Sequence, residues 1–211
     1  MPANPHAAAT RHLSRRCPVM KSVIARVGPC LWKHDDGDPY ALIVRCIVGQ
    51  QISGKAADSI FAKLTQSIGA VTPRRLAKAA DDQLQACGLS GGKRRAIRSV
   101  TDFVLANRKF LPGIPTATDE ELRAALVALN GIGPWTVDMF MMFGLGRPDV
   151  LATGDYGIRV GIQKLFSLES LPKPAELERL AEPWRPHRSV AMWYVWRSLD
   201  DEKKQERAKA K

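Results

Sequence analysis

The stretch Leu126–Phe143 reads LVALNGIGPWTVDMFMMF and predicts two helices joined by a tight turn. The first helical pattern stops near Asn130, Gly131-Ile132-Gly133 forms the turn, and Pro134 stands where a second helix opens. Glycine tolerates backbone angles that other residues avoid and has no Cβ, so such a turn can bring a phosphate onto bare N–H groups. The N-terminal end of the second helix would add its own N–H groups and positive dipole end. Ile132 can pin this turn to the core. The alternative for a GxG alone is a plain helix–helix turn with glycine at the C-cap.

Helical patterns also dominate the chain outside this hairpin. Thr72-Pro73 and the capping box Thr118–Glu121 mark two helix starts. Alternating strand patterns are scarce, so we predict an all-α fold. We expect the folded domain to span residues 17–199, with disordered tails over 1–16 and 200–211. Further helices are expected over Pro39–Gln51, Lys93–Asn107, Tyr156–Phe166, Ala175–Ala181 and Arg188–Leu199.

The chain of 211 residues carries a net charge of +11. Residues 1–16 contribute +3 and residues 200–211 contribute +1, which leaves +7 for residues 17–199. The predicted folded body is itself basic, and this favours a polyanionic partner. The longest strongly apolar run, Met139–Leu145, is far short of the ~20 residues of a membrane span, so no membrane partner is expected.

The cysteines and histidines indicate an intracellular protein without a metal centre. The cysteines show no CxxC spacing, and Cys46 and Cys87 lie in apolar surroundings typical of buried, reduced thiols. The four histidines show no ligand spacing with one another or with cysteine, so no metal site is predicted.

Together with its flanks, the string L-x-x-L-N-G-I-G-P-W-T resembles the helix-hairpin-helix element of the helix-hairpin-helix–Gly/Pro–Asp superfamily of DNA glycosylases. Asp149–Arg159 resembles the glycine-and-aspartate segment of that family. Residues 181–196 resemble the C-terminal helix of its alkylbase branch, the 3-methyladenine DNA glycosylase II type, and residues 47–53 and 88–93 match the same branch. These five segments cover roughly residues 39–196 in order. The resemblance implies a compact, two-lobed helical fold with the active site between the lobes.

Asp155 is the catalytic residue that the resemblance implies, because it follows Gly133 by 22 residues. A carboxylate beside the sugar stabilises the oxocarbenium-like transition state of glycosidic cleavage and can orient water. Taken alone, an Asp at a helix start is an ordinary N-cap, and the two roles are compatible. The rivals are Asp138, inside the second helix of the hairpin, and Asp149, in a turn.

Trp135 stands where the bifunctional glycosylase/lyases of the superfamily have their nucleophilic lysine. Indole cannot form a Schiff base, so we expect hydrolysis that leaves an abasic site, with no lyase activity. No cysteine follows Cys87, so no iron–sulfur cluster is expected, and no cofactor is required. Relatives suggest a monovalent cation at the hairpin, and the sequence leaves this open.

The resemblance also assigns binding residues. Trp135 and Trp196 match pocket aromatics for electron-poor alkylated bases, and Met139 stands where some relatives have tyrosine; the alternative places all three in the core. Gln51 matches the residue that fills the gap left by the flipped base, and a buried amide at a helix end is its alternative. Lys93, with Arg94, Arg95 and Arg98, forms a basic cluster that either binds phosphate or is solvated. The expected DNA contacts are Gly131, Ile132, Gly133, Thr136, Gln50, Gln51, Ser53 and Lys93.

These observations predict a monofunctional, monomeric enzyme of base excision repair that acts on double-stranded DNA, in a bacterial nucleoid or a eukaryotic nucleus. Alkylated bases such as 3-methyladenine and 7-methylguanine are the expected substrates. Two alternatives stay open: a glycosylase for deaminated or mismatched bases, and a DNA-binding module without catalysis.

Overall fold

The computed structural model describes residues 4–209, and the side chains of residues 4–201. Every regular element in that part of the chain is helical, which confirms the all-α prediction. The chain divides into two compact units: Asp35–Leu145 forms one, and the residues up to His34 together with those from Gly146 form the other. Within the described residues, no helix is long and apolar enough to cross a membrane. The expected active site between two lobes stays a prediction.

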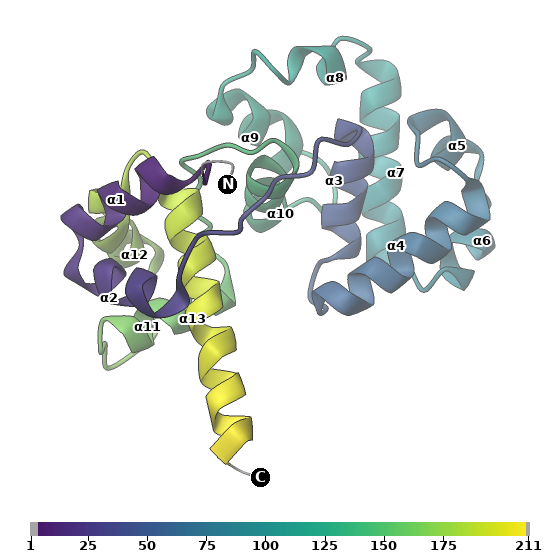
Figure 1. Cartoon of the computed structure of the whole chain (residues 1–211). Coiled ribbons are helices and arrows are strands. Elements are labelled where there is room, and N and C mark those ends of the chain that lie inside the picture. Colours follow the sequence, from purple (N-terminus) through teal and green to yellow (C-terminus); the bar gives the residue numbers. More distant parts are fainter. Residues whose placement is uncertain (1–3, 210–211) are drawn as a thin grey trace. The chain divides into compact units, whose positions relative to one another are not determined.

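The unit formed by the two chain ends is built around α13, drawn in yellow in Figure 1. α13 packs against α11 and α2, and α1 packs on α2. Gly161 of α11 makes the α11–α13 packing close, because a Cβ there would lie 2.4 Å from Val195 Cγ1. The elements of this unit are α1 (Ala7–Arg16), α2 (Pro18–Val27), α11 (Tyr156–Leu165), α12 (Pro174–Ala181), a 3₁₀ turn η2 (Glu182–Trp184) and α13 (Arg188–Lys209).

The disordered tails predicted from the sequence are wrong wherever the structure describes them. Ala9 and Leu13, one helical turn apart on α1, are both buried, so residues 7–16 fold as part of this unit. At the other end α13 continues to Lys209 instead of stopping at Leu199, as the run of Glu, Lys, Gln, Arg and Ala favours. Residues 1–3 and 210–211 of the predicted tails lie outside the described residues.

The Asp35–Leu145 unit is organised by α7, which packs against α3, α5 and α6. Tyr40 and Thr101 join α3 to α7 through a buried hydroxyl–hydroxyl hydrogen bond of 2.6 Å. The predicted caps at Thr72 and Thr118 are present, the latter as a complete capping box with Glu121. The helices are α3 (Pro39–Val48), α4 (Gly54–Ile68), α5 (Pro73–Lys78), α6 (Asp81–Ala86), α7 (Gly91–Ala106), α8 (Phe110–Gly113), α9 (Asp119–Val127) and α10 (Pro134–Met139).

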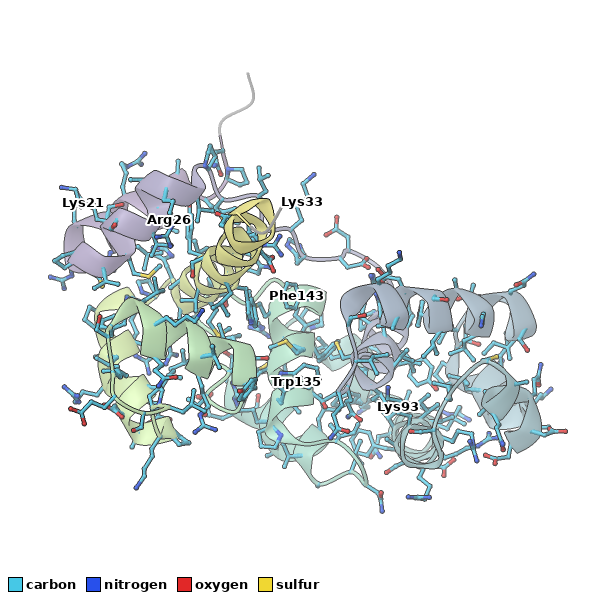
Figure 2. All side chains as sticks on the ribbon, turned by 90° about the horizontal axis from the view of Figure 1, so that it is seen from below. Lys21, Arg26, Lys33, Lys93, Trp135 and Phe143 are labelled. Carbon is cyan, nitrogen blue, oxygen red and sulfur yellow. The ribbon has the colours of Figure 1, made fainter. Side chains whose placement is uncertain are left out.

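The helix expected over Pro134–Phe143 begins as predicted but changes its winding after Met139. Phe140–Gly144 forms a π-helical turn, η1, in which Leu145 N donates to Phe140 O at 3.0 Å. A Cβ on Gly144 would lie 2.9 Å from the Phe140 ring and 3.3 Å from Leu42 Cβ. The wider turn therefore ends at a glycine that lets this ring and α3 come close. Figure 2 labels Trp135 and Phe143 on this segment.

Candidate active site

Asp155 caps the N-terminus of α11 and is partly exposed. Its Oδ1 accepts hydrogen bonds from Ile158 N at 2.7 Å and from Trp196 Nε1 at 3.0 Å. Its own backbone N donates to Ala152 O at 3.0 Å, so the residue is fixed through both its main chain and its side chain. The capping role confirms the simpler interpretation, and the carboxylate is at the same time held in one orientation.

Trp196 lies beside this carboxylate and is half-buried. Gly157 provides the room, because a Cβ there would lie 3.2 Å from both Trp196 Nε1 and Asp155 Oδ1. The indole N–H therefore serves to orient Asp155, which the sequence did not indicate. Whether the ring also lines a base pocket stays a prediction.

The two rival aspartates are both committed to ion pairs. Asp138 is 3% exposed and pairs with Arg123 of α9. Asp149 pairs with Arg188 and Arg185 at 2.8 Å each. These ion pairs give both carboxylates a structural role.

The two glycines of the hairpin turn, Gly131 and Gly133, have different structural roles. Gly131 has φ +77°, and a Cβ there would lie 2.7 Å from Ala96 Cβ on α7. Both the backbone angle and the lack of space therefore require glycine at this position. Gly133 has φ −93° and ψ 171°, ordinary extended backbone, and a Cβ there would meet no heavy atom within 4 Å. Only Gly131 therefore uses a backbone angle that other residues avoid, whereas Gly133 leaves the face of the turn open. Ile132 is buried, as predicted for the residue that pins the turn.

Gln50 and Thr136 fasten the turn after α3 to this hairpin. Gln50 Nε2 donates to Gly131 O at 3.0 Å and to Thr136 Oγ1 at 2.9 Å. Thr136 is only 3% exposed. These bonds hold the hairpin in place, and the predicted role of both residues as DNA contacts stays a prediction.

Gln51 is exposed and has φ +58°, a backbone conformation that is uncommon for a non-glycine residue. The alternative interpretation of a buried amide at a helix end is therefore wrong for Gln51, and Gln50 is the residue that fits it. An exposed side chain on a strained turn is consistent with the predicted wedge. Ser53 caps α4, where its Oγ accepts from Ala56 N at 3.3 Å.

The basic cluster on α7 is mostly occupied by structural bonds. Lys93 Nζ donates to Val48 O at 2.7 Å at the end of α3, and burial lowers the pKa of Lys93. Arg94 bonds Asp81 and Leu89 O, and Arg98 caps carbonyl groups at the end of α5. Lys93 thus caps the end of α3, its role as a DNA contact stays a prediction, and Arg95 is exposed. Figure 2 labels Lys93.

Trp135 and Met139 lie one helical turn apart on α10. Trp135 is half-buried, and Met139 is 7% exposed. The burial of Met139 is what its core alternative requires, and a role for either residue in a base pocket stays a prediction.

Cys46 is only partly accessible, and burial raises the pKa of its thiol to about 12, so it is no nucleophile at neutral pH.

Among the residues that the structure describes, no group of three or more His, Cys, Asp or Glu side chains could hold a metal ion. A monovalent cation at the hairpin would need backbone oxygen ligands. The turn offers carbonyl groups of that kind, such as Leu129 O, which accepts from Ile132 N at 3.2 Å and keeps a second lone pair. The donor type fits, and the cation stays a prediction.

The sequence predicts the start of α13 correctly but does not indicate what the residues there bind. Arg188, Ser189 and Met192 all bond the segment that leads to Asp155. Their spacing places them on one helix face with Trp196, and Asp149 supplies the acidic partner. A basic residue at the start of a helix is unfavourable for the helix dipole, and this was the available signal.

The helical hairpin at Gly131–Gly133 and the helix-capping Asp155 that follows it in the chain indicate the class of protein. The model of the HhH-GPD superfamily of base excision DNA repair proteins matches residues 44–186, and the chain belongs to this family.

Individual relatives agree over nearly the whole chain. The chain is 32% identical to the alkylbase DNA glycosidase-like protein mag2 of Schizosaccharomyces pombe, over 89% of this chain and 91% of that protein. It is 31% identical to DNA-3-methyladenine glycosylase 1 of the same organism, over 76% of this chain and 72% of that one. The solved structure of S. pombe 3-methyladenine DNA glycosylase (Mag1) in complex with abasic DNA matches with a TM-score of 0.83 and 29% identity, covering 90% of this chain and 95% of that chain.

Proposed function

We propose that this protein is a monofunctional DNA glycosylase of base excision repair that hydrolyses the N-glycosidic bond of alkylated bases and leaves an abasic site. The orientation of the Asp155 carboxylate by Ile158 N and Trp196 Nε1 is the observation that carries the proposal. The names of the relatives, which include 3-methyladenine glycosylases, supply the substrate class.

The chemistry follows from the charge that develops on the sugar. As the bond between C1′ and the base breaks, the sugar becomes oxocarbenium-like, and a fixed carboxylate stabilises it. Water then adds to C1′ and gives up a proton, while the base leaves with the bonding electrons. A base alkylated on a ring nitrogen carries positive charge and leaves as a neutral molecule, so it needs little protonation by the protein.

Trp135 supports hydrolysis without strand cleavage. It occupies the first turn of α10, two residues after the hairpin glycine Gly133, and indole offers no amine for a Schiff base. Burial lowers the pKa of Lys93, and its ammonium group donates a hydrogen bond to Val48 O.

The charge distribution supports DNA as the partner. Residues 4–34 carry six Lys and Arg and no acidic residue, and the structure places them in and around the folded helices α1 and α2. All six are exposed, including Lys21 and Arg26, which Figure 2 labels. The positive charge once assigned to a tail thus belongs in part to the folded protein, where it attracts a polyanion. We propose that the protein binds damaged duplex DNA as a monomer.

Release of free base from defined duplexes tests the proposal. Duplexes containing 3-methyladenine or 7-methylguanine, uracil or hypoxanthine are incubated with excess protein, and free base and strand breaks are measured separately. We expect release of alkylated base, with strand breaks only after alkali. Release of uracil or hypoxanthine alone would replace the substrate class, and binding without any release would leave a non-catalytic module. A covalent adduct trapped by borohydride would contradict the hydrolytic mechanism.

A further inference from the structure

The segment that leads to Asp155 is bonded along its length to one face of α13. Moving down that face, Arg188, Ser189, Met192 and Trp196 each bond this segment, which runs from Arg147 to Asp155. Positions 188, 192 and 196 repeat every four residues, so they form one stripe on the helix.

The first contact is an ion pair between Asp149 and Arg188. Arg188 Nε donates to Asp149 Oδ1 at 2.8 Å and Nη2 donates to Oδ2 at 2.9 Å, which is the bidentate geometry of a strong pair. Arg188 Nη2 also donates to Asp149 O at 2.7 Å. The two side chains are 15% and 22% exposed, so solvent screens the pair less than a surface ion pair.

The contacts farther along α13 are made to the backbone. Ser189 is fully buried; its Oγ donates to Arg147 O at 2.6 Å and accepts from Val150 N at 3.0 Å. Met192 Sδ accepts from Ala152 N at 3.2 Å. Each bond fixes one more step of the segment, and the last, from Trp196 Nε1 to Asp155 Oδ1, reaches the carboxylate itself.

We propose that Asp149 and Arg188 are positioning residues for the hydrolysis: they set the register of residues 147–155 on α13 and thereby place the Asp155 carboxylate against Trp196 Nε1. The inference rests on the proposed function, since the step that it serves is base release. Neither side chain touches the reacting atoms in this account. A displacement of about 1 Å at a reacting group can lower a rate roughly 100-fold, so loss of register is expected to act on the chemical step.

A purely structural role for the pair makes a different prediction. It would lower stability, while the folded fraction kept its full rate. A positioning role lowers the single-turnover rate of folded protein and leaves DNA affinity unchanged. In a positioning role, the loss of rate also depends on the bond from Trp196 Nε1 to Asp155 Oδ1.

The test uses Asp149→Asn, which keeps the shape of the side chain and removes its charge, and Arg188→Met. Asp200→Asn is the matched control, because Asp200 pairs with Arg197 on the same helix at 3.2 Å, with both side chains nearly half exposed. Single-turnover release of 7-methylguanine and the Kd for abasic duplex are measured well below the melting temperature. We expect Asp149→Asn to lower the rate by about 10- to 100-fold, with the Kd changed less than about 3-fold. Asp200→Asn should match the wild type in both. If Arg188→Met does not fold, Asp149→Asn alone carries the measurement.

Trp196→Phe completes a double-mutant cycle, because phenylalanine keeps an aromatic ring and lacks the N–H. If the register acts through the bond from Trp196 Nε1 to Asp155 Oδ1, Asp149→Asn lowers the rate of base release much less in the Trp196→Phe background than in the wild type. Equal costs in both backgrounds would overturn the proposal, as would a wild-type rate for folded Asp149→Asn beside an active wild type. Absence of base release by the wild type would instead overturn the proposed function, and the positioning role with it.

Discussion

Replacing each hairpin glycine with alanine separates folding from DNA binding. At Gly131 the new Cβ would sit at φ +77°, a conformation that costs a residue with a Cβ about 1–2 kcal/mol. The same atom would lie 2.7 Å from Ala96 Cβ, and overpacking of this kind costs about 1–3 kcal/mol. Together, Gly131→Ala is expected to lower the free energy of unfolding by about 2–5 kcal/mol.

Gly133→Ala is the matched change on the open face. Its backbone is extended and no heavy atom lies within 4 Å of the added Cβ, so the folded state gains no strain. Alanine also restricts the unfolded chain, and stability should stay constant or rise by about 0.4–1 kcal/mol. If the N–H groups of this turn bind a phosphate, the methyl group blocks its approach. Loss of one such charge-assisted bond would weaken DNA binding by about 1.5–3 kcal/mol, roughly 10- to 150-fold.

Urea unfolding and duplex DNA binding at fixed salt measure the two effects on the same preparations. Gly131→Ala should lower the unfolding midpoint strongly, and Gly133→Ala should weaken DNA binding without lowering the midpoint. Wild-type affinity of Gly133→Ala would refute the phosphate grip at this turn. Wild-type stability of Gly131→Ala would refute the steric argument.

Four further substitutions test three separate predictions. Gln51→Ala should slow single-turnover base release by about 10-fold without lowering the melting temperature, because flipping a base costs a few kcal/mol and the exposed side chain offsets part of that cost. Gln50→Ala should lower the melting temperature, because it removes two hydrogen bonds. Equal effects of the two variants on rate and melting temperature would contradict these separate roles. Arg123→Met should lower the free energy of unfolding in urea by about 3 kcal/mol because it removes the ion-pair partner of the buried Asp138 carboxylate, and a loss below about 1 kcal/mol would argue against the pair. Burial and the neighbouring His12 lower the pKa of His187 below its ordinary value, so the unfolded chain binds the proton more tightly; the resulting stability is present above about pH 6.5 and is lost as the pH falls through the folded pKa. His187→Gln should flatten the pH dependence of the melting temperature in that window, and an unchanged slope would show that other groups cause it.

The sequence carries the fold and the hairpin well because their signals are local. Helix starts such as Thr72-Pro73 and the Thr118 capping box are written in adjacent residues, and the structure has both. The positive φ of Gly131 likewise depends on the turn itself.

The tails and the binding residues depend on contacts between distant residues, and here the sequence misleads. Residues 7–16 look like a solvated tail until Ala9 and Leu13 find a packing partner in α2 and its neighbours. Lys93 looks like a free cation until the end of α3 comes within 2.7 Å. Gln50 and Gln51 are adjacent in sequence, but the Gln50 side chain bonds the distant hairpin whereas the Gln51 side chain is exposed.

The central claim is that the Asp155 carboxylate drives hydrolysis. Single-turnover release of 7-methylguanine by Asp155→Asn tests it most directly, with circular dichroism and the Kd for abasic duplex measured on the same protein. Asparagine keeps an oxygen that can accept from Ile158 N and Trp196 Nε1, so the variant is expected to fold and bind DNA. We predict that its rate falls by at least about 100-fold, the scale reported for removing one preorganised electrostatic group. A folded, DNA-binding Asp155→Asn that releases base at the wild-type rate would contradict the account.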